Sequence, residues 1–149
     1  MEHSNLSEPI SDFAVQLIDF NGYTYDKDSI TQDVMEQLIK FIQTTKKASI
    51  YLSLDEYGED EDSFLTLDIN NGWAAIAFNS WDENGISYMY QPVNKENNRL
   101  EEAPVCIGGQ TPVSKRNALQ DMKLVAECVQ YFAKTGERYS CLDWEMCDP

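Results

Sequence analysis

The chain has 149 residues, of which 42% are hydrophobic and 25% are charged, and its formal net charge is −15 at pH 7. These proportions are typical of a globular domain, and a chain of this length can bury one core without disulfide or metal staples. The charge disfavours direct binding to nucleic acid or to an anionic membrane, because both would repel the protein; it favours a basic partner or serves only as a solvated surface.

The cysteines and the histidine argue against a zinc site. None of the four cysteines, Cys106, Cys128, Cys141 and Cys147, forms a C-x-x-C pair, and the single histidine is His3. We therefore expect no structural zinc site, and we assign no cofactor. The start of the chain has neither a basic region nor an apolar core, so we expect no signal peptide and a cytoplasmic protein with reduced cysteines. No apolar run approaches the roughly 20 residues that a membrane-spanning helix needs.

The first third of the chain predicts a strand, a helix and a second strand. Residues 1–11 are polar and are expected to be loosely ordered, and residues 12–20 resemble a strand. Helical spacing of apolar residues predicts a helix over 28–44, with either of its first two residues as the cap. Alternation predicts a strand over 48–54. The residues expected to face the core are Phe13, Val15 and Leu17, then Ile30, Val34, Leu38, Phe41 and Ile42, then Ile50, Leu52 and Leu54.

Two strands joined at Asn71-Gly72 are predicted to form the centre of the sheet. Asn-Gly provides the two positive-φ residues of a type I′ turn, and a slip of one residue would turn the apolar side chains outward. The turn sets three apolar pairs on one face: Ile69 with Ala74, Leu67 with Ile76, and Leu65 with Phe78. The preceding strand is predicted to place Leu54 opposite Leu65, which leaves residues 58–61 as a four-residue loop.

The second half predicts two more strands, an extended segment and a long helix. A strand over 86–91 follows a second Asn-Gly turn, and residues 103–113 are extended but interrupted by glycine and proline, as in an edge strand. A helix is predicted over 114–134, and the glycine two residues later is suited to end it. Residues 139–147 are predicted to form the last strand.

This order of elements predicts the fold class α+β. We expect one mainly antiparallel sheet of five to seven strands with two helices packed on one face, in a single domain over residues 1–149. The long helix would be long enough to cross the sheet.

The face opposite the helices is predicted to carry aromatic, small and acidic side chains, a mixture typical of interfaces. If the second Asn-Gly turn has a loop of two or four residues, Tyr88 and Tyr90 share this face with Trp81, and Met89 lies on the other. The alternative is that a loop such as 94–110 folds over the aromatic side chains.

The densest charge cluster is residues 55–62, with six carboxylates in eight residues. These groups repel one another and would attract a cation or a cationic partner. Calcium is one candidate, but the spacing does not fit an EF-hand loop. The same cluster is compatible with a solvated loop and with a docking point for a basic protein.

No pattern in the chain predicts catalysis. The sequence has no GxxxxGK[ST] or GxGxxG motif, and His3 lies in a polar tail, where it is a poor base for a serine or cysteine nucleophile. A pair of carboxylates remains an alternative, but nothing singles out one pair among the 26 acidic residues. We therefore expect a protein that is not an enzyme.

Several short motifs occur in an order that is found in a known family. Residues 131–138 read YFAKTGER and contain an F-x-x-T-G turn after a helix, residues 142–145 read LDWE, and residues 72–76 read GWAAI. Over about residues 30–146 the chain resembles immunity protein family one (Imm-one) of bacterial polymorphic toxin and contact-dependent growth inhibition systems. The acidic segment 55–62 is not part of these motifs.

The resemblance implies a cytoplasmic antitoxin that binds and blocks a cognate toxin domain, often a nuclease or a nucleobase deaminase. Toxins that act on nucleic acid tend to carry basic clefts, and an acidic protein can occupy such a cleft as a phosphate mimic. We expect the protein to cover the active or substrate-binding surface of a basic toxin. An acidic adaptor without a toxin partner and a small carboxylate-based enzyme are the alternatives.

The predicted interface combines the acidic segment with the second Asn-Gly turn and its flanking aromatic residues. We expect a protein partner, no nucleic-acid or membrane partner, and a monomer or weak dimer, and we assign no catalytic, cofactor-binding or metal-binding residue. The residues predicted to bind the partner are Asp55, Glu56, Tyr57, Glu59, Asp60, Glu61, Asp62, Trp81, Asp82, Glu83, Tyr88 and Tyr90.

Overall fold

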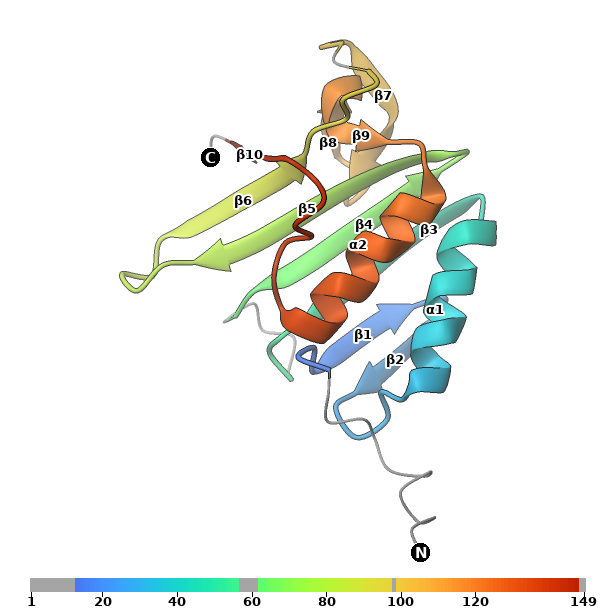
Figure 1. The fold of residues 1–149 in the computed structure, drawn as a ribbon, viewed down its shortest axis with the longest axis vertical. Helices are drawn as coiled ribbons and strands as arrows, with labels where there is room; N and C mark the ends of the chain where they lie inside the picture. The colour runs from blue at the N-terminus through green and yellow to red at the C-terminus, as the bar shows by residue number, and fades with distance from the viewer. Residues whose placement is uncertain (1–12, 57–61, 98, 148–149) are drawn as a thin grey trace, which may run out of the picture.

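An antiparallel sheet carries two helices on one of its faces (Figure 1). The computed structural model describes residues 13–56, 62–97 and 99–147, and all structural statements concern these residues. The elements are β1 (Leu17–Phe20), β2 (Tyr23–Asp26), α1 (Gln32–Thr44), β3 (Lys47–Ser53), β4 (Phe64–Asn70), β5 (Trp73–Trp81), β6 (Ser87–Pro92), β7 (Glu102–Ile107), β8 (Thr111–Ser114), a 3-10 turn (Lys115–Asn117), β9 (Ala118–Leu119), α2 (Met122–Thr135) and β10 (Trp144–Cys147).

The fold class α+β is confirmed. Seven strands follow one another in the order β10-β6-β5-β4-β3-β1-β2, and the two-residue strand β9 pairs with β5 as an eighth. Both helices lie against one face, where their apolar stripes share a core with the sheet (Figure 1). Strands β7 and β8 form a separate two-stranded sheet. Strands β2 and β9 were not predicted, because they are short and carry no long alternating pattern.

The central hairpin has the predicted register. Asn71 and Gly72 have φ angles of +48° and +88°, as a type I′ turn requires. The three apolar pairs of β4 and β5 are confirmed, and all their members are buried beneath the helices. The register that the turn sets is therefore the one that places the apolar residues of both strands on the buried face.

The predicted register between β3 and β4 is wrong by two residues. Leu52, and not Leu54, lies opposite Leu65, and the ladder ends where Ser53 pairs with Phe64. A shift of two residues keeps every side chain on its face, so the apolar pattern does not detect it. The connection between the strands is consequently longer than four residues.

Both helices begin later than predicted. Thr31 is the N-cap of α1 and its hydroxyl accepts a hydrogen bond from the amide of Val34 (3.2 Å), and Asp121 caps α2. The residues between Ser114 and Asp121 form the 3-10 turn and β9 instead of the first turns of α2, because β9 adds to the edge of β5 left free beyond β6. The end of α2 is as predicted, since Gly136 is the left-handed residue that terminates it.

The first predicted strand has its core face displaced by one residue. Leu17 was predicted to face the core with Phe13 and Val15, but Ile18 is the fully buried residue. The amide of Val15 bonds to the carbonyl of Ala133 (3.1 Å) at the end of α2, so this segment does not yet belong to the sheet. The alternation of buried and exposed side chains along the sheet begins only at Leu17, where β1 pairs with β3.

Candidate functional site

The hairpin of β7 and β8 covers part of the sheet face that the helices leave open. Residues 103–113, which were predicted to form an extended edge strand, fold back on themselves at Gly108 and Gly109, both of which have positive φ angles. The hairpin packs against Ala75 of β5. Its buried apolar side chains are Ala103, Val105 and Val113.

Two polar contacts from β4 hold this hairpin on the sheet. Asp68 is 7% exposed, and its carboxylate accepts hydrogen bonds from the hydroxyl of Ser49 (2.6 Å) and from the backbone amide of Gly108 (2.9 Å). The side-chain amide of Asn70 donates to the carbonyl of Pro104 (2.8 Å). The hairpin is therefore fixed at the end of the sheet that contains the central turn.

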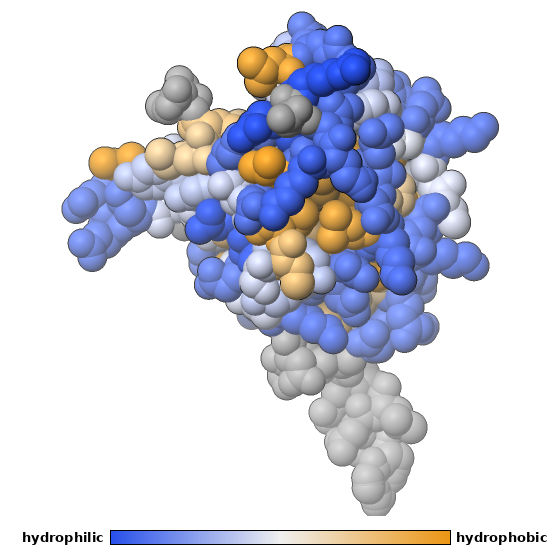
Figure 2. Space-filling model, turned by 45° about the horizontal axis from the view of Figure 1, so that its top comes forward, coloured by the Kyte–Doolittle hydropathy of each residue, from blue (hydrophilic) through white to orange (hydrophobic). Residues whose placement is uncertain are grey.

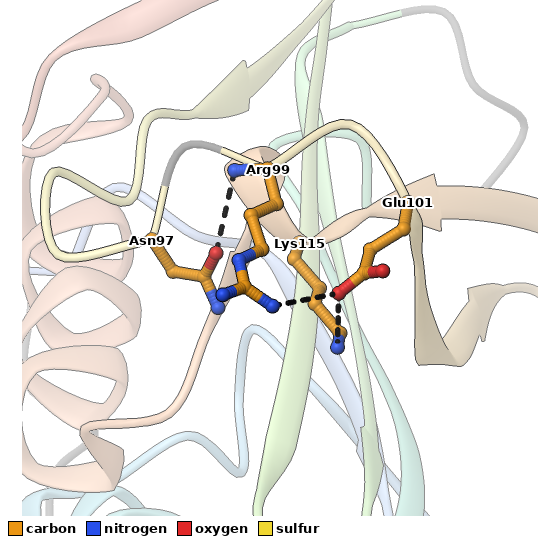
Figure 3. A network of polar contacts seen from close by, with 4 residues as sticks. All are labelled: Asn97, Arg99, Glu101 and Lys115. Carbon is orange, nitrogen blue, oxygen red and sulfur yellow. Dashed lines mark hydrogen bonds and ion pairs between the residues drawn. The ribbon is translucent and has the colours of Figure 1, made fainter.

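Basic side chains at the base of this hairpin are paired within the molecule. Figure 3 shows Glu101 between Lys115 and Arg99, whose nitrogens lie 2.7 and 3.4 Å from the same carboxylate oxygen. The backbone amide of Arg99 also donates to the side-chain oxygen of Asn97 (3.3 Å). The hydrogen bond from Lys115 is the main reason that the pKa of Glu101 is lowered. These cations stabilise the loop before β7.

Beyond the hairpin, an aromatic row crosses β3, β4 and β5 on the helix-free face. The ring centroids of Tyr51 and Phe64 are 5.5 Å apart, and those of Phe64 and Trp81 are 5.8 Å apart. All three side chains are half-buried. The alternative that a loop such as 94–110 folds over the aromatic side chains does not hold for this row, because β7 and β8 cover the other end of the face and the three rings keep exposed surface.

A cavity of about 260 Å³ separates the hairpin tip from the aromatic row. Its walls include Ile107 and Gly108 of the hairpin and Tyr51 and Thr66 of the sheet. The Oγ1 atom of Thr66 is buried and is without a hydrogen-bond partner among the described residues.

The acidic segment 55–62 lies next to this row in sequence, and the structure describes three of its predicted partner-binding residues. Asp55 is half-buried and its amide bonds to the hydroxyl of Ser53 (2.9 Å), Glu56 forms an ion pair with Lys27 (2.6 Å), and Asp62 is exposed. The predicted interface residues Tyr57, Glu59, Asp60 and Glu61 lie outside the described residues.

The predicted face of Tyr88 and Tyr90 is wrong. Trp81 pairs with Ser87, so the loop between β5 and β6 has five residues, an odd number that exchanges the two faces of β6. Tyr90 lies opposite Phe78 on the helix side, where the guanidinium of Arg138 stacks 4.0 Å from its ring centroid. Tyr90 is therefore part of the core edge. Met89 shares the face of Trp81 instead.

Asp82 organises the five-residue loop. Its Oδ1 atom accepts hydrogen bonds from the amides of Asn84 (2.9 Å) and Ile86 (3.0 Å), and its Oδ2 atom accepts one from the hydroxyl of Tyr88 (3.1 Å). The bond from Ile86 is the largest cause of the lowered pKa of Asp82, and the bond to Asp82 raises the pKa of Tyr88. Glu83, at the loop apex, is exposed.

The distribution of basic residues is a signal that the sequence analysis missed. The chain has no lysine, arginine or histidine between Lys47 and Lys95, a stretch that includes β4, β5, β6 and both loops beside the aromatic row. The acidic residues of this stretch are Asp55, Glu56, Glu59, Asp60, Glu61, Asp62, Asp68, Asp82 and Glu83. Among the described ones, Asp55, Glu56, Asp62, Asp82 and Glu83 lie where β3 ends, β4 begins and β5 ends, so they share one end of the sheet.

Metal ligands, helices and thiols among the described residues bear on other classes of function. Within them, no group of three or more His, Cys, Asp or Glu side chains is placed to hold a metal ion, and no helix is long and apolar enough to cross a membrane. Cys128 is fully buried, and this burial raises the pKa of its thiol to about 12. A cavity of about 310 Å³ lies beside the start of α2, where its polar side chains include the ion pair of Lys95 and Asp143 (2.9 Å).

Compared with models of protein families, with curated proteins and with solved structures, the chain gives no significant match. The resemblance to immunity protein family one stays a prediction that the short motifs alone carry. The candidate site is accordingly argued from its geometry.

Proposed function

We propose that this protein is an immunity protein that neutralises a basic bacterial toxin domain by covering its active or substrate-binding surface. The observation that carries the proposal is the aromatic row of Tyr51, Phe64 and Trp81, which remains partly exposed at the acidic end of the sheet. Aromatic anchors surrounded by charge are typical of binding hot spots.

The charge of this end supports a basic partner. Association between oppositely charged surfaces is steered, and its rate constant rises above that of a neutral pair at low ionic strength. The stretch without basic residues surrounds the aromatic row, while Arg99, Lys115 and Arg116 pair with Glu101 and Glu145 elsewhere. A basic surface that approaches the row therefore meets no exposed cation from this stretch.

The test uses the toxin domain that the neighbouring reading frame is expected to encode. Co-expression should protect cells from that domain, and the two proteins should co-purify. Absence of both results would contradict the proposed function and would favour an adaptor without a toxin partner.

Charge reversal tests where the partner binds. The double variant Glu61→Lys/Asp62→Lys should slow association about tenfold or more at low salt and should flatten its dependence on salt. The matched control is Glu36→Lys/Glu137→Lys, which makes the same change in net charge at exposed positions of the helical side. Equal rates for the two variants would contradict the assignment of the surface.

A further inference from the structure

The hairpin of β5 and β6 extends past the strands beside it. Strand β4 begins at Phe64, opposite Asn79, and β10 pairs with β6 only as far as Met89. Residues 80–88 therefore pair only with each other within the described part of the chain. Figure 1 shows this ribbon leaving the sheet at the left, and Figure 2 shows it as a narrow projection with a mostly hydrophilic end. We define residues 80–88 as the arm.

We propose that the arm enters a concave, positively charged cleft of the partner protein and occupies the place of its anionic substrate. The inference rests on the proposed function and goes further, because it assigns the inhibitory contact to one element and specifies the shape and charge of the surface that receives it. The aromatic row would then dock on the rim of that cleft.

The shape of the arm is the first argument. A two-stranded ribbon is narrow, and its apex residues Glu83, Asn84, Gly85 and Ile86 are all exposed. Such an element fits a cleft better than a flat surface, since a flat surface would contact only its tip. Trp81, at the base of the arm, contacts Phe64, so the arm and the aromatic row form one continuous surface.

The rigidity of the apex is the second argument. Asp82 accepts three hydrogen bonds within the arm, and its own amide donates to the carbonyl of Ile86 (3.0 Å) while the amide of Gly85 donates to the carbonyl of Asp82 (3.0 Å). A loop fixed by its own contacts loses little conformational entropy when it binds. The apex is therefore preorganised without help from the rest of the sheet.

The chemistry of the apex defines the partner. Asp82 and Glu83 are adjacent carboxylates, the arm contains no basic residue, and Ile86 is 54% exposed beside them. Two negative charges with one apolar contact complement a cleft lined by lysine or arginine with an apolar wall. A protein site that binds the phosphates and bases of a nucleic acid has this composition.

The first experiment measures inhibition and affinity with the purified toxin domain from the neighbouring reading frame. The variant Glu83→Lys/Ile86→Ser should weaken binding about 30-fold or more, as loss of a hot spot does. The matched control Glu137→Lys/Met146→Ser reverses one exposed acid and truncates a methionine that is 55% exposed, outside the arm; it should stay within about threefold of wild type. Melting temperatures of both variants show whether the fold is retained.

The second experiment asks whether the arm and a polyanion compete. Heparin bound to the basic cleft of the toxin domain should exclude the wild-type protein, and a ternary complex with heparin in the cleft would overturn the proposal. Wild-type affinity of Glu83→Lys/Ile86→Ser would overturn it as well and would favour flat docking of the aromatic row. Failure of the wild-type protein to bind the toxin domain would instead overturn the proposed function, and the role of the arm with it.

Two variants of Asp82 distinguish the contribution of the arm's rigidity from that of its charge, because both remove the charge and only one removes the side-chain hydrogen bonds. Asp82→Asn keeps a side-chain oxygen that can accept the two amide hydrogen bonds, whereas Asp82→Ala removes both side-chain acceptors and leaves only the backbone carbonyl. The alanine variant should bind more weakly than the asparagine variant and should show faster exchange of the Ile86 amide. Equal affinities would overturn the preorganised apex as part of the proposal.

Discussion

The carboxylate of Asp68, in the middle of β4, accepts a hydrogen bond of 2.9 Å from the backbone amide of Gly108, which lies 40 residues further along the chain at the tip of the β7–β8 hairpin. The same carboxylate accepts the hydroxyl of Ser49 at 2.6 Å. One buried side chain thus joins the two sheets and determines how much of the helix-free face stays open.

Replacing Asp68 with alanine should loosen the hairpin. The change removes the acceptor of the Gly108 amide and of the Ser49 hydroxyl. Because both of these residues are exposed, water can replace the acceptor in part, and the loss should be about 0.5–1.5 kcal/mol. Urea unfolding should show a loss of this size, and hydrogen exchange of the Gly108 amide should accelerate. Glu137→Ala, at an exposed position, should change the free energy of unfolding by no more than about 0.5 kcal/mol. Unchanged exchange at Gly108 would show that the hairpin is held by its apolar contacts alone.

Gly136→Ala tests the end of α2 against Leu54. The φ angle of Gly136 is +75°, and a Cβ atom built there would lie 3.0 Å from Cδ1 of Leu54. Gly109 has the same φ angle with nothing within 4 Å of a Cβ atom, so Gly109→Ala measures the backbone cost alone. That cost is about 1–2 kcal/mol, and Gly136→Ala should exceed it in thermal or urea unfolding. Equal losses would mean that Leu54 moves aside freely.

The ion pair between Arg116 and Glu145 should make stability depend on pH. The Nε atom of Arg116 donates to both carboxylate oxygens of Glu145 (2.8 and 2.9 Å), and this hydrogen bond is the main cause that lowers the pKa of Glu145 below its usual 4.5. A lowered pKa in the folded state stabilises the protein above the unfolded pKa, and the contribution is lost as the pH falls through the folded value.

The variant Glu145→Gln isolates that contribution. The difference between its free energy of unfolding and that of wild type should be constant above about pH 5 and should shrink as the medium becomes more acidic. Urea titrations at several pH values measure this difference, and the pair is half-exposed, so it should not exceed about 1 kcal/mol. A difference that grows on acidification would contradict the assignment.

The cysteines should differ in reactivity according to their burial. Cys141 is exposed, whereas Cys128 is fully buried and has its thiol pKa raised to about 12 by that burial. With a thiol reagent at pH 8, Cys141 should react in the native state and Cys128 only after unfolding, since the thiolate is the nucleophile. Mass spectrometry after a timed reaction assigns the modified residues, and the variant Cys141→Ser should lack the fast phase. Early modification of Cys128 would indicate that the core around α2 opens readily.

The sequence determined the elements that a few neighbouring residues specify. Asn71-Gly72 specified the central turn and its register, and the apolar stripes of both helices specified which side of each helix faces the sheet. Gly136 specified the end of α2. In each case the chemistry of a few adjacent residues allows only one backbone conformation or one buried face, so no distant contact was needed.

Tertiary structure decided the features that depend on distant partners, or on whether a loop has an odd or an even number of residues. A register two residues away keeps the same faces, so only the ladder itself placed Leu52 opposite Leu65. The side chain of Asp82 shaped a loop with an odd number of residues, which moved Tyr90 into the core edge and left Trp81 with the aromatic row. The extent of the open face followed from Asp68 and Gly108, because a hydrogen bond across 40 residues leaves no periodic trace in the sequence.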